Sequence, residues 1–444
     1  MLDQAREIFF SALQAVDARA ATRRAVSLSN SLLRIGDTAI SIGGRSVYLV
    51  AIGKAAGAMT AGLAEVLNSR ISRAIVCGPT AEGLNPDWAV FAGGHPFPTE
   101  ASIAAARASL ELLAKAERNA LIVFLISGGG SAMFELPVNE SISLADLREA
   151  NRQLVSCGAS IAEINAVRRA FSAVKGGKLA SIAPHRDQIT LIVSDTNPGD
   201  ATSVASGPTL EPDAAGGDAR EVVQRYGLLA SLPHSILGAI EESRVEEVAQ
   251  STGLRAHYVL LDNRKALESA AAEARSRGFI VELATDINEQ EIGAGCDLLI
   301  ARSVSLWNQN EGKPVCLVSG GEFLCPVRGS GVGGRNLETV LRSAMKLDEM
   351  RRAAITAHWA VLSAGTDGVD GNSKAAGAVA DETTIARAKR NRLESSNFLE
   401  HSDAFHFFEQ LGDLIVTGLT GTNVRDVRIV LVESGASSRQ SRKN

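Results

Sequence analysis

The sequence predicts an α/β fold of two layered domains, and three observations support this prediction. Short apolar segments alternate along the chain with Ala-rich segments of helical periodicity. The 444 residues exceed the usual length of one domain, which is roughly 100–200 residues. The chain contains 41 glycines but only 4% aromatic residues, so its cores must be built mainly from aliphatic side chains, which suits layered α/β folds.

The expected strands are mostly apolar along their whole length, which indicates that helices cover both faces of each sheet. In order along the chain, these strands lie at residues 47–52, 74–77, 121–126, 189–194, 258–261, 279–283, 315–318, 360–362, 414–416 and 429–432. The helices expected between them include residues 54–69, 100–117, 144–156 and 264–277. The repeated strand–helix order predicts parallel or mostly parallel sheets.

The boundary between the two domains is expected near residues 232–254. The segment SLPHSI interrupts the strand–helix order there, and the charged stretch at 241–250 is expected to form a connecting helix. The prediction is therefore one α/β domain over residues 1–245 and a second over residues 255–444.

Composition and charge argue against several classes of protein. The net charge is −5 and no Lys/Arg-rich stripe is present, so nucleic acid is not an expected partner. The amphipathic N-terminal segment does not resemble a signal peptide, and the apolar runs are too short to span a membrane. The five cysteines form no CxxC pair, and the histidines show no zinc-binding spacing. We expect a protein of the reducing cytoplasm.

The strongest local feature is the segment SGGGSA, which directly follows the strand at 121–126. Consecutive glycines let backbone N–H groups turn toward an anion, and serine hydroxyls add further donors. The carboxyl end of a parallel strand is also where ligands bind in open α/β sheets. The segment predicts phosphate or carboxylate binding, with an ordinary glycine turn as the alternative. Its residues are Ser127, Gly128, Gly129, Gly130 and Ser131.

Gly53 and Lys54 follow the strand at 47–52 and precede an Ala-rich helix. A lysine beside a helix N-terminus adds its charge to the positive end of the helix dipole, so Lys54 is well placed to hold a phosphoryl group or a carboxylate. A surface lysine on a helix is the alternative. The segment GKAAG lacks the full dinucleotide-binding spacing, and no acidic residue closes the next strand at 74–77.

Two carboxylates follow the strand at 189–194. Asp195 lies at the strand end, and Asp200 follows a Pro-Gly turn. Carboxylates in such a loop bind Mg²⁺ or take a proton from a hydroxyl group. We expect a functional role for Asp195, whereas Asp200 is equally well explained as a turn or cap residue. For His95, in a Gly/Pro-rich loop, a structural role is favoured over a substrate contact.

In the second half of the chain, Gly320, Gly321 and Glu322 follow a strand, and the segment RGSGVGGR then leads into a helix. Its arginines, Arg328 and Arg335, predict a mobile anion-binding loop, because arginine contacts phosphate through two donors and stays charged. A flexible solvated loop is the alternative.

Further polar residues follow the strands at 360–362 and 414–416. Asp367 and Asp370 are spaced among glycines, and a strand-end acid that acts as a base or metal ligand is the favoured interpretation. Asn423 and Asp426 follow a Gly/Thr turn, where a ligand contact and a capping role are both open.

Taken together and in this order, these segments resemble the glycerate 2-kinase family, which combines an N-terminal glycerate kinase domain with a C-terminal MOFRL-type domain. The resemblance runs over nearly the whole chain. The matching segments are AIGKAAGAM, GGHPFPTEAS, LISGGGSAMFELP, INAVRRAFSAVKGGKLA, LIVSDTNPGDATSVASGPT, LVSGGE, GVGGRNLE, SAGTDGVDG and TGLTGTNVRD.

The resemblance implies two Rossmann-like, three-layer α/β domains that face a cleft. It implies that ATP, with Mg²⁺, phosphorylates D-glycerate at its 2-hydroxyl group to give 2-phosphoglycerate and ADP. Lys54, Arg335, Asp195 and Asp367 match the family's key residues and are the expected catalytic residues, and the two aspartates are also the expected metal ligands. Besides the SGGGSA loop, the expected substrate- or phosphate-binding residues are Lys175, Glu322, Arg328 and Asn336.

Phe171, Leu337 and Lys374 depart from residues common in the family, which bears on substrate specificity more than on reaction class. A hydroxypyruvate reductase that uses a nicotinamide cofactor is the alternative activity, although no G-x-G-x-x-G fingerprint supports it. A non-catalytic binding protein for sugar acids or nucleotides is a third alternative. A homodimer is compatible with the sequence.

Overall fold

The computed structural model describes residues 1–79, 83–211, 216–243, 252–353 and 357–434. The chain forms two compact units. The first, which we name the parallel unit, comprises Ala18–Asp262 together with Gly421–Asn423. The second, the mixed unit, comprises Met1–Asp17, Asn263–Thr420 and the chain from Val424 onward.

The parallel unit is built on a six-stranded sheet in which all neighbouring strands are parallel. The strands stand in the order β6-β5-β4-β7-β8-β9. The chain runs from β4 outward through β5 to β6 and then returns to the other side of β4 as β7, so the strand order reverses between β4 and β7. In α/β sheets, ligands bind at the carboxyl ends of the strands beside such a switch point. The strands are β4 Val47–Ile52, β5 Ile71–Cys77, β6 Ala89–Phe91, β7 Leu121–Ser127, β8 Asp187–Val193 and β9 Arg255–Leu261.

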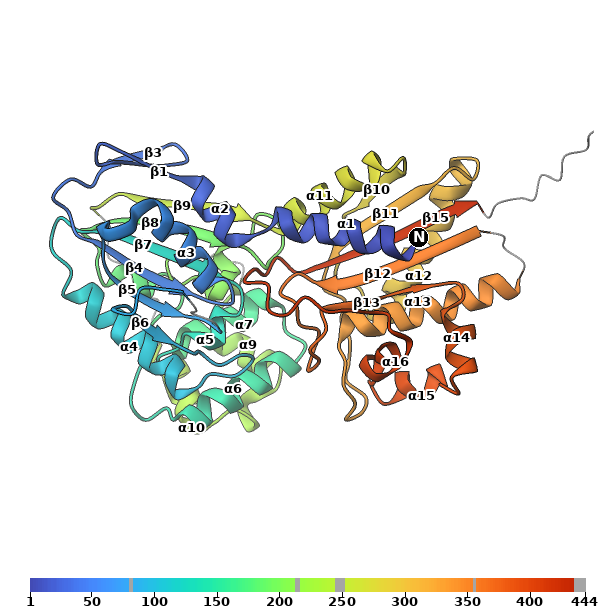
Figure 1. Cartoon of the computed structure of the whole chain (residues 1–444). Helices are drawn as coiled ribbons and strands as arrows, with labels where there is room; N and C mark the ends of the chain where they lie inside the picture. The colour runs from blue at the N-terminus through green and yellow to red at the C-terminus, as the bar shows by residue number, and fades with distance from the viewer. Residues whose placement is uncertain (80–82, 212–215, 244–251, 354–356, 435–444) are drawn as a thin grey trace, which may run out of the picture. The chain divides into compact units, whose positions relative to one another are not determined.

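Helices complete the parallel unit. Every residue of β4 and β7 is buried, as the apolar sequence of both strands predicts. A separate core lies among α6, α7, α9 and α10, which gather in one region of the unit (Figure 1). The α-helices are α2 Ala18–Ala25, α3 Ala56–Leu67, α4 Glu100–Ala114, α5 Gly130–Met133, α6 Leu144–Ser156, α7 Ile161–Phe171, α8 Lys178–Ser181, α9 Ala219–Arg225 and α10 His234–Glu242.

Shorter elements also belong to this unit. A small antiparallel sheet, which the sequence reading did not include, is formed by β1 Val26–Ser29, β2 Leu32–Ile35 and β3 Thr38–Ser41. The 3₁₀ helices among the described residues include η1 Asn68–Arg70, η2 Ala201–Ser206 and η4 Leu228–Ala230. The helices α6 and α7 begin with capping boxes, in which Ser143 and Ser160 accept hydrogen bonds from the N–H groups of Asp146 and Glu163.

The mixed unit contains a second six-stranded sheet, in the order β10-β11-β15-β12-β13-β14. Only β10 and β11 are parallel, and all other neighbours are antiparallel. The α/β class is confirmed, but the expectation of a mostly parallel sheet is wrong here. Continuous burial shows that both faces of a strand are covered and does not fix its direction. The strands are β10 Ile280–Ala284, β11 Val315–Gly321, β12 Ala357–Gly365, β13 Gly377–Asp381, β14 Leu414–Ile415 and β15 Asp426–Ser434.

The first helix of the chain belongs to the mixed unit, where α1 lies beside α11 (Figure 1). Its face with Ala5, Ile8, Phe9 and Ala12 is buried. The Ser269 hydroxyl donates to the Ser11 carbonyl of α1 at 3.3 Å. The helices of the unit are α1 Leu2–Ala15, α11 Asn263–Ser276, α12 Ile292–Gln309, α13 Arg335–Arg352, α14 Thr384–Arg390, α15 Ser395–Glu400 and α16 Ala404–Leu411.

The two units divide the chain differently from the expected ranges 1–245 and 255–444. β9 pairs with β8, so the parallel unit extends to Asp262. The connecting helix expected at 241–250 falls mostly outside the described residues. None of the helices that the structure describes combines the length and the apolar character needed to cross a lipid bilayer.

Two helical glycines of the parallel unit provide a test of its packing. A Cβ atom at Gly62 in α3 would lie 2.2 Å from the carbonyl oxygen of Arg19 in α2, whereas a Cβ atom at Gly238 in α10 would meet nothing within 4 Å. We expect Gly62→Ala to destabilise the protein, because the backbone of α2 must move. Gly238→Ala should stabilise it by about 0.5–1 kcal/mol, since alanine is the better helix former. Thermal unfolding followed by circular dichroism would contradict this packing if both variants shifted the midpoint equally.

Candidate functional site

Hydrogen bonds join the carboxyl ends of β4 and β7 at the switch point of the parallel unit. The Lys54 N–H donates to the Gly128 carbonyl at 2.8 Å. The Ser127 hydroxyl donates to the Ile52 carbonyl at 3.1 Å and accepts from the Ala55 N–H at 3.0 Å. Ser127 is fully buried, and its hydroxyl holds the two strand ends together. It is therefore not available to donate to an anion, although the sequence suggested that role.

Gly128 lies against the carboxylate of Asp195. A Cβ atom at Gly128 would lie 1.9 Å from Oδ2 of Asp195 and 2.8 Å from Nδ2 of Asn423. The Asn423 amide donates to the same carboxylate oxygen at 3.4 Å. Only glycine therefore allows the loop after β7 to approach the aspartate that follows β8 so closely.

Gly129 lies close to Lys54 and His95. Its φ is +79°, and a Cβ atom there would lie 3.1 Å from Cγ of Lys54 and 3.2 Å from Cδ2 of His95. In the part of the chain that the structure describes, the N–H groups of Gly129, Gly130 and Ser131 donate to no acceptor. Three backbone donors thus lie beside a lysine, which is a chemistry suited to an anion.

Lys175 does not lie in this group. Its ammonium forms an ion pair with Glu135, and each side chain is only 1% exposed. Glu135 also accepts from the Ser172 hydroxyl at 2.5 Å and the Leu136 N–H at 3.0 Å. Burial lowers the pKa of Lys175, although the charge of Glu135 opposes this shift. The expected contact between Lys175 and a phosphate group is not supported, because the ammonium is bound inside the protein.

The mixed unit brings a second group of charges to one edge of its sheet. β15 runs antiparallel to β11 and β12, so its first residue, Asp426, lies opposite their last residues, Gly321 and Gly365. Arg335, at the start of α13, binds Asp426 through Nε at 2.6 Å and Nη2 at 3.0 Å. Nη2 also lies 2.9 Å from Oε1 of Glu322. The predicted residues Arg335 and Glu322 are therefore in contact.

Both members of the Arg335–Asp426 pair are held in their charged forms. Burial alone would lower the pKa of Arg335, but the carboxylates of Asp426 and Glu322 raise it well above its usual value. Burial alone would raise the pKa of Asp426, but Arg335 and Arg428 lower it overall. Nη1 of Arg335 donates to none of the described residues, and the side chain is 34% exposed. It can therefore bind a further anionic group.

Asp370 caps the first turn of α13 from the connection between β12 and β13. Its Oδ1 accepts from the Asn336 N–H at 3.0 Å, and its Oδ2 accepts from the Leu337 N–H at 2.8 Å. The Asn336 amide donates to Asp426 at 2.9 Å and accepts from the Ser363 hydroxyl at 2.6 Å. Asn336 is therefore a buried link between two carboxylates, and its side chain is not presented to a ligand as the sequence favoured.

The glycine-rich loop before α13 is held in place, whereas the sequence favoured a mobile loop. The Gly331 N–H donates to the His401 carbonyl at 3.0 Å, and the Arg328 N–H donates to the Ser402 hydroxyl at 2.9 Å. The guanidinium group of Arg328 pairs with Glu338 at 3.2 Å. The glycines allow close contact with the segment before α16, and Arg328 is engaged by a carboxylate of its own unit.

The expected magnesium ligands lie in different units. Asp195 belongs to the parallel unit, and Asp367 belongs to the mixed unit, where its Oδ1 accepts from the Val369 N–H at 3.1 Å. Among the residues that the structure describes, no three His, Cys, Asp or Glu side chains group closely enough to hold a metal by themselves. Mg²⁺ in kinases is commonly held by one or two carboxylates together with substrate phosphates, so each aspartate fits the role of a single ligand.

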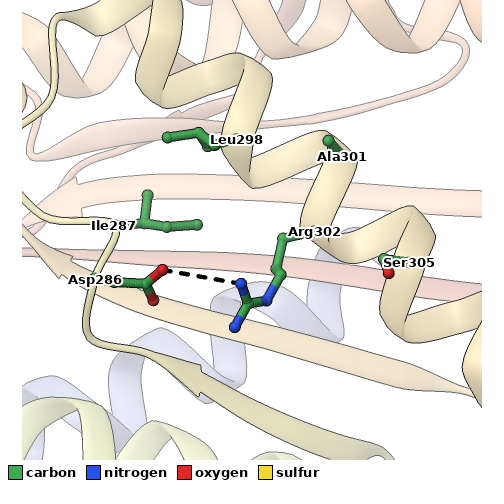
Figure 2. Close-up of a pocket in the computed structure, with 6 residues that line it drawn as sticks. All are labelled: Asp286, Ile287, Leu298, Ala301, Arg302 and Ser305. Carbon is green, nitrogen blue, oxygen red and sulfur yellow. Dashed lines mark ion pairs between the residues drawn. The ribbon is translucent and has the colours of Figure 1, made fainter.

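A hollow of about 250 Å³ beside α12 is a weaker candidate. Figure 2 shows Arg302 of α12 pointing toward Asp286, at 3.9 Å, and Arg302 also binds Glu282 at 2.6 Å. Its one cation is thus neutralised by its neighbours, and no predicted site residue lines the hollow. The lining residues are Asp286, Ile287, Leu298, Ala301, Arg302 and Ser305.

Comparison with known proteins gives a consistent assignment. Residues 4–241 match the domain of unknown function DUF4147, and residues 315–426 match the MOFRL family. A D-glycerate 2-kinase from Thermotoga maritima is 33% identical over 391 residues, which cover 87% of this chain and 90% of the relative. A glycerate 2-kinase from Pyrococcus horikoshii is 33% identical over 433 residues, or 95% of each chain. The chain belongs to the glycerate 2-kinase family.

The fold agrees with membership of the glycerate 2-kinase family. The crystal structure of a glycerate kinase from Thermotoga maritima superimposes with a TM-score of 0.78 at 30% identity, over 97% of this chain and 99% of that one. The protein is accordingly an enzyme, a kinase. A relative from Agrobacterium vitis, 32% identical over 88% of this chain and 100% of its own length, carries the provisional name hydroxypyruvate reductase.

Sequence reasoning missed the central position of Asp426 and Asp370 in the mixed unit of this glycerate 2-kinase family member. The sequence alone does not decide between a cap and a ligand contact for Asp426, because the importance of this residue depends on β15 lying between β11 and β12. The segments DGVDG and NVRD each carried a signal, namely an aspartate next to a strand end. The sequence favours a structural role for His95 and leaves Asn423 open between a ligand contact and a cap, and the structure places both beside the glycine loop.

The contact between Gly128 and Asp195 gives a prediction about activity. Gly128→Ala should displace Asp195 and lower kcat by roughly 10²-fold or more, because catalytic groups tolerate little displacement. Gly43→Ala is a matched control, since a Cβ atom there would meet its nearest neighbour, in Ser31, at 3.4 Å. Unimpaired turnover in Gly128→Ala, at a thermal midpoint equal to that of the wild type, would contradict the role of Asp195.

Asp370 should make the stability of the mixed unit depend on pH. Burial raises its pKa from 3.8 to about 7, although the N–H groups of Leu337 and Asn336 and the charge of Arg335 oppose the shift. Between these pH values the folded chain keeps a proton that the unfolded chain has lost. The contribution of Asp370 to the free energy of unfolding therefore falls as the pH rises from about 4 to about 7.

Asp370→Asn should remove this contribution, because the amide keeps the size of the side chain and does not titrate. Urea unfolding of both proteins at about pH 4.5 and about pH 7.5 measures the difference. We expect the wild type to lose more stability than the variant over this interval. The same pH dependence in both proteins would show that Asp370 is already ionised throughout.

Proposed function

We propose that the protein uses ATP and Mg²⁺ to phosphorylate D-glycerate at its 2-hydroxyl group, which gives 2-phosphoglycerate and ADP. The proposal is supported by the names of the relatives in the glycerate 2-kinase family. It is also supported by the chemistry at the strand ends, since phosphoryl transfer requires mainly positioning and neutralisation of charge.

The observation that carries the proposal is the group at the switch point of the parallel unit. Lys54 lies next to Gly129, and the loop there presents backbone N–H groups, so this part of the site suits phosphate oxygens. The carboxylate of Asp195 lies against Gly128 of the same loop. An anionic substrate with a reacting hydroxyl group requires a cation, backbone donors and a carboxylate. This loop region contains all three.

In this proposal Asp195 takes the proton of the attacking hydroxyl group, and Asp367 is a ligand of Mg²⁺ together with phosphate oxygens. Mg²⁺ supplies neutralisation of the phosphate charge when it is bound. Arg335 binds an anionic substrate group through Nη1, while Asp426 and Glu322 hold the rest of its guanidinium group.

The roles of the two aspartates are separated by their dependence on Mg²⁺. We expect Asp195→Asn to lower kcat without changing the Mg²⁺ concentration that gives half-maximal activity. Asp367→Asn should raise that concentration. The reverse pattern would exchange the two assignments.

The alternative activity is reduction of hydroxypyruvate with a nicotinamide cofactor, which the provisional name of one relative suggests. The turn after β4 lacks the G-x-G-x-x-G spacing, and β5 ends at Cys77 without the acidic residue that binds the ribose of such cofactors. Two assays distinguish the activities. Release of ADP with D-glycerate and ATP supports the kinase, whereas oxidation of NADH or NADPH with hydroxypyruvate supports the reductase. The position of the phosphate in the product follows from its ³¹P and ¹³C NMR spectra.

Lys54 provides the sharpest test of the proposed site. Lys54→Ala should lower kcat by roughly 10²- to 10³-fold, because the variant loses a charge that stabilises the transferred phosphoryl group. Lys115→Ala is the control, since that lysine is 80% exposed and pairs with Glu111 of the same helix region at 3.8 Å. The thermal midpoints of both variants should stay near that of the wild type. Near-normal turnover of Lys54→Ala would rule out this role.

A further inference from the structure

A chain of three polar side chains runs from the glycine loop into the interior of the parallel unit. The hydroxyl groups of Ser131 and Ser206 lie 2.8 Å apart. Ser206 in turn donates to Oδ1 of Asn165 at 2.8 Å. Ser206 and Asn165 are 2% and 3% exposed, whereas Ser131 is only partly buried. This hydrogen-bonded series of side chains therefore begins in the interior, at Asn165, and ends at Ser131 in the loop that carries the candidate site.

The hydrogen bonds in this chain have one direction. A serine hydroxyl has a single proton, and Ser206 donates its proton to the Asn165 oxygen. The bond between the two serines must then be donated by Ser131 and accepted by Ser206. The proton of Ser131 is thus committed inward, and its oxygen can act toward a ligand only as an acceptor.

The backbone around Ser206 is held in an unfavourable conformation, which fixes the position of the Ser206 hydroxyl group. Ala205 and Ser206 have φ values of +53° and +61°, which are rare for residues other than glycine. The Ser206 carbonyl accepts from the Gly176 N–H at 3.1 Å. A Cβ atom at Gly130 would lie 2.6 Å from the Cβ atom of Ala205, so this segment is packed tightly against the glycine loop. Backbone strain of this kind is maintained only where the surrounding structure enforces it.

We propose that Ser131 is a specificity-determining residue whose Oγ accepts a hydrogen bond from the substrate hydroxyl group that is not phosphorylated. Ser206 and Asn165 are the positioning residues that set its polarity. This inference rests on the proposed function, in which that group is the 3-hydroxyl of D-glycerate.

An acceptor at this position restricts the group that it binds. Phosphate and carboxylate oxygens carry no proton at neutral pH, so they gain nothing from an oxygen that can only accept. The attacking hydroxyl group must lose its proton to a base, and a serine whose own proton is committed to Ser206 is a poor base. A hydroxyl group that keeps its proton through the reaction fits the site. This corrects the expectation that Ser131 donates to an anion.

The experiment compares D-glycerate with D-lactate, which has the 2-hydroxyl group and lacks the 3-hydroxyl group. The measured quantity is the ratio of kcat/KM for the two acids at saturating ATP and Mg²⁺. We expect the wild type to prefer D-glycerate and Ser131→Ala to lower that preference about tenfold, as the loss of one hydrogen bond predicts. The KM for ATP should not change.

Ser206→Gly tests the positioning role without a cost in backbone strain, because glycine adopts a positive φ freely. It removes the acceptor for the Ser131 proton and should also lower the preference. Ala205→Gly is the matched control, since it relieves strain at the neighbouring residue and leaves the hydroxyl chain intact. Its preference should equal that of the wild type.

The outcomes separate the two proposals. A wild type that does not phosphorylate D-glycerate overturns the proposed function and this inference with it. A wild type that phosphorylates D-glycerate, with a preference that Ser131→Ala leaves unchanged, overturns only the inference. Loss of the preference in Ala205→Gly as well would show that the segment acts through packing and not through the hydroxyl chain.

Discussion

The ion pair between Asp426 and Arg335 determines how the candidate site of the mixed unit is assembled. Asp426 is the first residue of a strand that runs against both of its neighbours, so its carboxylate reaches the edge where β11 and β12 end. It holds two nitrogens of Arg335 and the amide of Asn336, and it is completely buried. Removing Arg335 would leave the buried carboxylate of Asp426 without its main cationic partner, which is unfavourable in the interior of a protein. The orientation of Arg335 is therefore fixed from within the unit.

The parallel unit reaches a comparable result with backbone geometry in place of charge pairs. Gly128 and Gly129 bring a loop into contact with Asp195, Lys54 and His95, at distances where no side chain would fit without displacing a neighbour. A helix–strand scaffold with fully buried β4 and β7 holds these loops at a switch point. The two units thus present cations and carboxylates by different physical means, one through close approach of the backbone and the other through buried pairing.

Features that depend on neighbouring residues in the sequence could be predicted. Apolar runs identified β4, β7, β8 and β11. The residues that directly follow those strands identified Lys54, the SGGGSA loop and Asp195 as site candidates. The carboxyl end of a strand is a local property, so a strand followed by glycine, serine, lysine or aspartate is informative by itself.

Features that depend on distant pairing could not be predicted. The direction of β15 cannot be deduced from its apolar sequence. The importance of Asp426 depends on that direction, so it could not be predicted either. Lys175 lies in a motif that resembles a binding segment, yet its partner Glu135 is 40 positions away and both are buried. Ser127 and Ser131 have similar positions in the sequence, on either side of the three glycines. In the structure, the Ser127 hydroxyl joins two strand ends, whereas the Ser131 hydroxyl contacts Ser206.

The membership of α1 in the mixed unit has a consequence for the order of events during synthesis. The apolar face of α1 is buried by elements that begin with α11, and the main segment of the parallel unit, Ala18–Asp262, is encoded between the two helices. At a ribosomal rate of roughly 5–20 residues per second, the separation of about 250 residues delays the partner of α1 by roughly 10–50 s. The parallel unit can acquire most of its structure in that time, while the partners of Ile8 and Phe9 in α1 have not yet been synthesised. The apolar face of α1 can therefore be buried only after the chain from α11 onward has been synthesised.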